Sequence, residues 1–249
     1  MPQTLQAHFD ALKQSGKKGL LVLIDPDKIP NPLEGFIRRV EAVGSLAILV
    51  GGSLTLDEEI RQLIPRIKEL TDLPVILFPG NVNQVVSAAD GILLLSLISG
   101  RNPDLLIGRH VEAAPLIKAS GLQVLPTGYL LIESGVATTV NYISQTIPIP
   151  RQKSEIAMCT ALAGEQLGLR MMYLDGGSGA RYPVPAEMIS SVAEALSIPL
   201  IVGGGIRSAE AVQSAWRAGA DLVVVGTVLE DPRLGEDFLT EMTHVKINL

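Results

Sequence analysis

The sequence predicts an α/β fold, a (β/α)8 TIM barrel, and two patterns carry that prediction. Eight short apolar runs recur along the 249 residues, and longer stretches with helical spacing separate them. The runs are almost continuously apolar, as parallel strands buried on both faces are. Eight strand–helix units in about 250 residues match the size of such a barrel. We therefore expect a single domain over residues 1–249. A doubly wound open sheet is the alternative, because a count of strands does not establish closure.

Each apolar run is expected to form one strand. In chain order the runs are Leu20–Ile24, Leu46–Val50, Val75–Phe78, Ile92–Leu95, Val124–Leu131, Met171–Leu174, Leu200–Val202 and Leu222–Val225.

Helices are expected between these strands. The apolar residues of Pro185 to Leu196 fall on one helical stripe. A second stripe runs from Leu56 to Leu70, and Pro65 within it predicts a kink. The longest irregular stretch, Glu133 to Lys153, contains Pro148-Ile-Pro150, which disfavours a helix, and is interpreted as a lid or insertion before a helix that begins near Ser154.

Composition excludes several classes of function. Against 20 Lys and Arg stand 26 Asp and Glu, which gives a net charge of −6 and disfavours a dedicated nucleic-acid or anionic-membrane binder. Hydrophobic residues make up 47% and the mean hydropathy is +0.34. The longest apolar runs nevertheless fall short of the roughly 20 residues that span a bilayer, so any membrane contact is expected to be peripheral.

Cysteine content and the N-terminus favour a cytoplasmic protein. Cys159 is the only cysteine, which excludes an internal disulfide and a zinc site made of cysteines. The first residues lack the basic and apolar regions of a secretory signal, so we expect the chain to begin as mature protein.

Glycine-rich turns follow the last three predicted strands. They are Asp175–Gly179, Gly203–Gly205 and Gly226-Thr227. A barrel builds its active site at the carboxyl ends of its strands, and its recurrent phosphate site lies after strands seven and eight. Glycine lets backbone N–H groups approach an anion closely. We predict a local phosphate site here, with simple tight turns as the alternative.

Two carboxylates stand at strand ends. Asp25 follows the first strand, where it could hold Mg²⁺ together with an oxygen from Ser53. Alternatively, Asp25 and Asp27 merely cap a turn. Asp175 follows the sixth strand and could accept a proton from a substrate hydroxyl; the alternative is an aspartate that stabilises the turn.

Other reactive residue types are expected to be structural. His8, His110 and His244 fall in predicted helices or termini away from the strand ends, so surface or packing roles are expected. Packing in the core is also expected of Cys159, Trp216 and the pair Met171-Met172.

With these residues placed, nearly the whole chain resembles the geranylgeranylglyceryl phosphate synthase family, which in bacteria includes heptaprenylglyceryl phosphate synthases. The motifs that carry the resemblance, together and in this order, are Ile24–Lys28, Gly51–Ser53, Thr127–Ile132 with Thr146–Arg151, Tyr173–Ala180, Val202–Ile206 and Val225–Thr227. The extra residue in Asp175–Gly179, and the lack of a lysine two residues before Asp25, resemble the archaeal and Bacteroidetes-type branch.

The resemblance implies a reaction and its site. Enzymes of the family join the 3-hydroxyl of sn-glycerol 1-phosphate to C1 of a long-chain prenyl diphosphate, which releases diphosphate and forms an ether lipid. Mg²⁺ on Asp25 and Ser53 would neutralise the departing diphosphate. The implied glycerol phosphate site comprises Tyr173, Leu174, Asp175, Gly176, Gly177, Ser178, Gly179, Gly204, Gly205, Gly226 and Thr227. An apolar groove for the prenyl chain is also expected, as is assembly into a homo-oligomer.

One position departs from the family pattern. The family usually has Glu and then Ala where this chain has Asp175 and Gly176. The carboxylate is one methylene shorter, so either the backbone moves inward or the role of base is in doubt.

Two rival functions stay open. A sugar-phosphate isomerase or lyase on the same barrel would use Asp25 as base and need neither metal nor prenyl substrate, although no second acid stands after strand five, where Thr127-Gly-Tyr129 lies. A phospholigand-binding barrel without catalysis is the other rival, which the shorter carboxylate at Asp175 invites.

Overall fold

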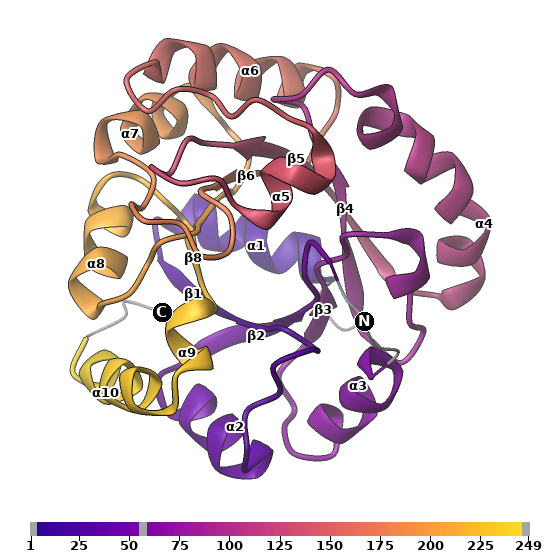
Figure 1. The fold of residues 1–249 in the computed structure, drawn as a ribbon, viewed down its shortest axis with the longest axis vertical. Coiled ribbons are helices and arrows are strands. Elements are labelled where there is room, and N and C mark those ends of the chain that lie inside the picture. The colour runs from indigo at the N-terminus through magenta and orange to yellow at the C-terminus, as the bar shows by residue number, and fades with distance from the viewer. Residues whose placement is uncertain (1–3, 55–58, 246–249) are drawn as a thin grey trace.

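A closed barrel of eight parallel strands forms the centre of the molecule (Figure 1). The computed structural model describes residues 4–54 and 59–245. The strands are β1 (Gly19–Ile24), β2 (Ser45–Val50), β3 (Val75–Leu77), β4 (Gly91–Ser96), β5 (Gln123–Leu131), β6 (Met171–Asp175), β7 (Leu200–Gly203) and β8 (Leu222–Val225). Each strand pairs with the next in sequence, and β8 pairs with β1, so the (β/α)8 prediction is confirmed and the open sheet is wrong.

Helices surround the strands. They are α1 (Leu5–Ser15), α2 (Leu33–Ala42), α3 (Ile60–Lys68), α4 (Arg109–Ser120), α5 (Thr139–Ser144), α6 (Ser154–Gln166), α7 (Ala186–Ala195), α8 (Ala209–Arg217), α9 (Thr227–Glu230) and α10 (Pro232–Thr243), with a short 3-10 helix η1 (Val82–Gln84) and a short π-helix η2 (Asp104–Gly108). The beginning of the predicted stripe at Leu56 lies outside the described residues. No helix within residues 4–54 and 59–245 is long and apolar enough to cross a bilayer.

The buried side chains form two separate layers. One lies between the outer faces of the strands and the surrounding helices, and includes Trp216 and Met172. The other fills the barrel and includes Met171 and Tyr173. Packing roles for the methionine pair and for Trp216 are therefore confirmed.

Helix α1 closes the amino-terminal end of the barrel. Its buried residues Leu5, Phe9 and Leu12 pack into the interior layer. The backbone N–H of Leu5 donates to Oε1 of Gln123 at 2.7 Å, which ties the helix to the start of β5. Figure 1 shows α1 behind the strands, with α5 and α9 in front of them. The open end is therefore the carboxyl end.

Two expectations about local structure are wrong. The stretch from Glu133 to Lys153 is not wholly irregular, because it contains α5, whose first turn is held by a capping box between Thr138 and Asn141. Cys159 is exposed on α6 instead of packing in the core, because the buried face of that helix is formed by Ala157, Ala161 and Gly164. The start of α6 at Ser154 is as predicted.

Candidate active site

A cavity of about 490 Å³ opens at the carboxyl ends of the strands. It has a polar part and an apolar part. The polar lining from the predicted site comprises Asp25, Ser53, Tyr173, Asp175, Gly177, Ser178, Gly179, Gly204, Gly205, Gly226 and Thr227. Leu174 and Gly176 do not line it. Alternation along β6 turns the Leu174 side chain outward into the helix-facing layer, and the Gly176 N–H donates to the carbonyl of Gly203.

Asp175 is the last residue of β6 and points into the barrel, as Met171 and Tyr173 do by alternation. Only 6% of it is exposed. The Tyr129 hydroxyl donates to Oδ2 at 2.6 Å, and the Gly177 N–H donates to Oδ1 at 2.7 Å. The carboxylate thus stabilises the turn, and it also faces the cavity.

Burial raises the pKa of the Asp175 carboxyl above its ordinary value, and the hydrogen bonds from Tyr129 and Gly177 act to lower it. Such a carboxylate is a stronger base than one in water. A carboxylate oxygen has more than one lone pair, so each can accept a further proton donor. The arrangement is suited to take a proton from a substrate hydroxyl.

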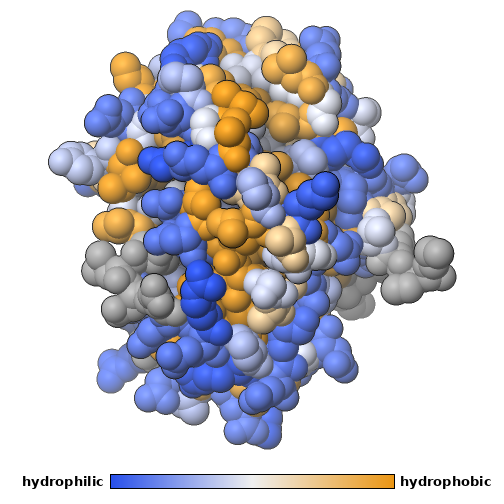
Figure 2. Space-filling view, turned by 90° about the vertical axis from the view of Figure 1, so that its right-hand side faces the viewer, coloured by the Kyte–Doolittle hydropathy of each residue, from blue (hydrophilic) through white to orange (hydrophobic). Residues whose placement is uncertain are grey.

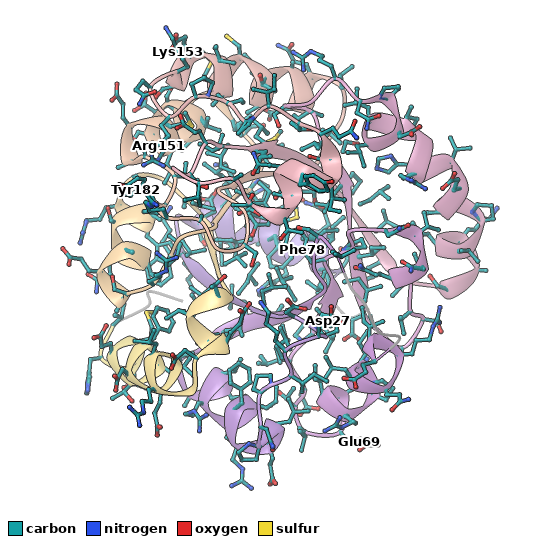
Figure 3. The ribbon with its side chains drawn as sticks, in the orientation of Figure 1. Asp27, Glu69, Phe78, Arg151, Lys153 and Tyr182 are labelled. Atoms are coloured by element: carbon teal, nitrogen blue, oxygen red, sulfur yellow. The ribbon has the colours of Figure 1, made fainter. Side chains whose placement is uncertain are left out.

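Three aromatic rings line the barrel beneath Asp175. Phe78 stacks on Tyr173 at 5.4 Å between ring centroids, and Tyr129 is tilted against Tyr173 at 5.6 Å. Figure 3 shows Phe78 near the centre of the barrel. Burial, and then the charge of Asp175, raise the pKa of Tyr129 well above the usual tyrosine value, so its hydroxyl stays a proton donor. Sequence reasoning missed this role of Tyr129, although alternation with Leu125 and Leu131 places it inside the barrel.

The glycine-rich turns after β6, β7 and β8 meet at the polar part of the cavity. Gly204 has φ +79°, and a Cβ there would lie 2.5 Å from Oδ1 of Asp175, so only glycine fits. Ser178 and Thr227, from two different turns, have their hydroxyl oxygens 3.5 Å apart. A cationic side chain that sequence reasoning missed, Arg207, also lines the cavity and donates to the carbonyl of Ala180 at 2.8 Å. These features are suited to an anion such as phosphate.

The segment before α6 is joined to the turn after β6. Arg151 donates to the carbonyls of Glu133 at 3.1 Å and Pro183 at 2.8 Å. Its guanidinium carbon lies 5.4 Å from the ring centroid of Tyr182, and Figure 3 shows the two side by side. The carbonyl of Ser134 accepts the N–H of Tyr182 at 3.1 Å. The insertion therefore holds the far end of the glycine-rich turn.

Asp25 and Ser53 both line the cavity, on the side of β1 and β2. The Asp27 N–H donates to Oδ1 of Asp25 at 3.0 Å, so Asp25 does stabilise a turn. A Cβ built on Gly52 would lie 3.7 Å from the same oxygen, which places the carboxylate against the strand end that carries Ser53. Carboxylate and hydroxyl oxygens are ligands that suit Mg²⁺, an ion that takes only one or two protein carboxylates when phosphates complete its shell. The donor set fits.

The apolar part of the cavity runs outward between β4 and α4. Its lining includes Val82, Val85, Ile92, Leu94, Leu105, Ala113 and Ile117. Figure 2 shows an apolar band on the side of the molecule where α4 lies, flanked by polar surface. This groove has the apolar lining that a site for a prenyl chain requires.

The expectation that all three histidines lie away from the strand ends is wrong for His110. Its Nε2 lies 3.5 Å from the hydroxyl of Ser96, the last residue of β4, and the ring lines the cavity. It lies there because η2, which leads into α4, folds back on the strand end: the Ser96 hydroxyl donates to the carbonyl of Leu106 at 3.3 Å. His8 and His244 are exposed, as expected.

Comparison with known proteins decides the relationship. The model of the PcrB family matches residues 13–246. The chain belongs to this family. A geranylgeranylglyceryl phosphate synthase from Spirosoma linguale is 54% identical over 89% of this chain and 90% of its own length. One from Chitinophaga pinensis is 51% identical over 88% and 87%. The crystal structure of (S)-3-O-geranylgeranylglyceryl phosphate synthase from Thermoplasma acidophilum, in complex with sn-glycerol-1-phosphate, has a TM-score of 0.91 and 32% identity, and covers 99% of both chains.

These findings confirm the family resemblance read from the motifs and the barrel fold. Within this PcrB-family barrel, the structure gathers the glycine-rich turns, Asp175, Asp25 and Ser53 around one cavity. The shorter carboxylate at Asp175 is placed within hydrogen-bond reach of Tyr129, from the neighbouring strand.

Proposed function

We propose that the protein is a Mg²⁺-dependent prenyltransferase that joins sn-glycerol 1-phosphate to a long-chain prenyl diphosphate. One observation carries the proposal: an anion cradle, a buried carboxylate and an apolar groove share a single cavity. An isomerase or lyase of sugar phosphates has no use for the apolar groove. The relatives named geranylgeranylglyceryl phosphate synthase support the same choice.

In the proposed reaction, the glycine-rich turns after β6, β7 and β8 hold the phosphate of glycerol phosphate. The groove between β4 and α4 holds the prenyl chain and excludes water from its reactive end. Mg²⁺ held by Asp25 and Ser53 would neutralise charge that develops on the diphosphate. Three tasks are thus divided among three parts of the cavity.

Bond making and breaking follow from this placement. The 3-hydroxyl oxygen of glycerol phosphate forms a bond to C1 of the prenyl group, and the bond from C1 to the diphosphate oxygen breaks. The diphosphate leaves with that electron pair. The hydroxyl proton passes to Asp175, whose raised pKa makes it a stronger base than an aspartate in water.

A turnover assay tests the proposal. Purified protein is incubated with radiolabelled sn-glycerol 1-phosphate and prenyl diphosphates of several lengths, with Mg²⁺ or with EDTA. We expect a labelled product extractable into organic solvent, only with Mg²⁺ and only with long prenyl chains. Binding of glycerol phosphate without any product would favour the non-catalytic barrel. Conversion of a sugar phosphate in EDTA would favour the isomerase or lyase.

A further inference from the structure

Lys28 is a cationic side chain of the cavity that the proposed reaction leaves without a task. It lies in the turn after β1, where its backbone N–H donates to the carbonyl of Asp25 at 2.9 Å. Its Nζ lies 2.7 Å from Oε2 of Glu230 and 3.7 Å from Oδ2 of Asp25. Half of the side chain is exposed. Lys28, Asp25 and Glu230 all line the cavity.

The ammonium group of Lys28 is expected to move away from Asp25 when a metal ion binds that carboxylate. Oδ1 of Asp25 already accepts the N–H of Asp27, and Oδ2 is the oxygen that Lys28 approaches. A divalent cation on that carboxylate would repel the ammonium group. Lysine has a flexible four-carbon stem, so its charge can move without any change in the backbone.

The charges around Asp25 indicate which bound group the displaced ammonium group of Lys28 would contact. A diphosphate placed at Asp25 and Ser53 brings several negative charges close to Asp25 and Glu230, more than one divalent cation offsets. The other lysine and arginine side chains on the described cavity wall make their contacts away from Asp25. Arg207 donates to the carbonyl of Ala180, and Arg109 pairs with Glu112 at 3.1 Å.

We propose that Lys28 is a ligand of the diphosphate group, which it contacts after leaving Asp25 to the metal. Glu230 holds Lys28 at the cavity when no diphosphate is present. This inference rests on the proposed function, because it concerns the diphosphate of the prenyl substrate. It assigns Lys28 to substrate binding and to stabilisation of the leaving group.

Calorimetric titration with inorganic diphosphate in excess Mg²⁺ tests the proposal. Loss of a hydrogen bond to a charged group predicts that Lys28→Gln weakens binding about tenfold or more. Arg38→Gln is the matched control, because Arg38 pairs with Glu34 on α2, away from the cavity, and should leave binding unchanged. Glu230→Gln breaks the same ion pair but keeps the lysine, so it should bind diphosphate at least as tightly as wild type.

A second measurement separates ligand loss from damage to the turn. Mn²⁺ serves as a paramagnetic substitute for Mg²⁺, and its binding without diphosphate is followed by electron paramagnetic resonance. Lys28→Gln should bind Mn²⁺ more tightly than wild type, since the competing ammonium group is gone. A distorted turn would instead weaken both metal and diphosphate.

The outcomes are distinct. If wild type transfers prenyl groups and Lys28→Gln binds diphosphate as wild type does, the role of Lys28 is overturned and the proposed function stands. If Glu230→Gln weakens diphosphate binding as much as Lys28→Gln does, the ion pair is structural and the inference fails. If wild type neither binds diphosphate nor turns over prenyl substrates, both proposals fail together.

Discussion

At Asp175, two opposing influences act on one carboxyl group. Burial favours its protonated form, while the donors Tyr129 and Gly177 favour its ionised form. A general base must be ionised before it can accept a proton. In the proposed reaction, the balance at this residue therefore sets the pH below which activity falls.

Tyr129→Phe should shift that balance in a known direction. The change removes a hydrogen bond that lowers the pKa of Asp175, so the pKa rises further. We expect the acid limb of the pH profile of kcat/KM to move to higher pH, which is read from initial rates across pH. Tyr142→Phe is the control, because Tyr142 is exposed on α5. An unmoved limb in Tyr129→Phe would mean that Asp175 does not set it.

Asp175→Asn tests the base itself. The substitution keeps the volume of the side chain but removes the site that accepts the proton, so we expect the rate to fall about 10²–10⁴-fold. Affinity for glycerol phosphate, measured by calorimetry, should change little because backbone donors hold the phosphate in the proposed complex. Asp175→Glu restores the side chain usual in the family and should stay active. Near-wild-type turnover by Asp175→Asn would leave Asp175 only an orienting role.

The two carboxylates at strand ends could be predicted from sequence, whereas the partner of Asp175 inside the barrel could not. Asp25 and Asp175 each follow an apolar run, where a charge is conspicuous. Tyr129 lies within such a run, and its partner Asp175 is 46 residues away in sequence. Only the register between β5 and β6, which pairs Tyr129 with Tyr173, brings the hydroxyl to that carboxylate.

At the scale of elements, the turn after β7 is fitted against the turn after β6. Gly204→Ala would place a Cβ 2.5 Å from both Oδ1 of Asp175 and the backbone N of Gly176. We expect affinity for glycerol phosphate, measured by calorimetry, to fall at least about tenfold. Gly16→Ala is the matched control, since Gly16 has φ +70° but no atom within 4 Å of its Cβ position. It should share the backbone cost of roughly 1 kcal/mol and keep full affinity.

The contact between the insertion and the turn after β6 makes a separate prediction. Arg151→Gln removes the cation–π contact and weakens the bonds to the carbonyls of Glu133 and Pro183. We expect KM for glycerol phosphate to rise several-fold, with a smaller change in KM for the prenyl diphosphate. Lys153→Gln is the control, because Lys153 is exposed and pairs with a neighbour, Glu155, at 3.6 Å. Equal changes in both KM values would contradict a local role.

Element boundaries show why the insertion resisted prediction. Strands and long helices can be recognised from their apolar residues, which form a continuous run in β6 and a helical stripe in α7. The helix α5 has six residues and is followed closely by Pro148-Ile-Pro150, so no helical period can be read from it. Its position depends on distant contacts, such as the bridge between Ile132 and Ile149.

At the scale of the whole molecule, the groove interrupts the outer of the two apolar layers. The outer layer is open between β4 and α4, where Leu94 is only partly buried. Leu94→Trp should narrow the groove and lower kcat/KM for a long prenyl diphosphate more than for a short one. Leu116→Trp, on the exposed side of α4, is the control. If both chain lengths respond equally to Leu94→Trp, the prenyl chain lies elsewhere.

The closure of the barrel by α1 also constrains how the enzyme empties. Since Leu5, Phe9 and Leu12 fill the opposite end, reactants and product must share the opening at the carboxyl ends. The proposed ether product would occupy the anion cradle and the groove at once, so neither substrate could enter before it departs. Its headgroup favours water and its chain does not, so escape into water is unfavourable. An acceptor for the chain, such as a lipid surface, would then set the pace of the cycle.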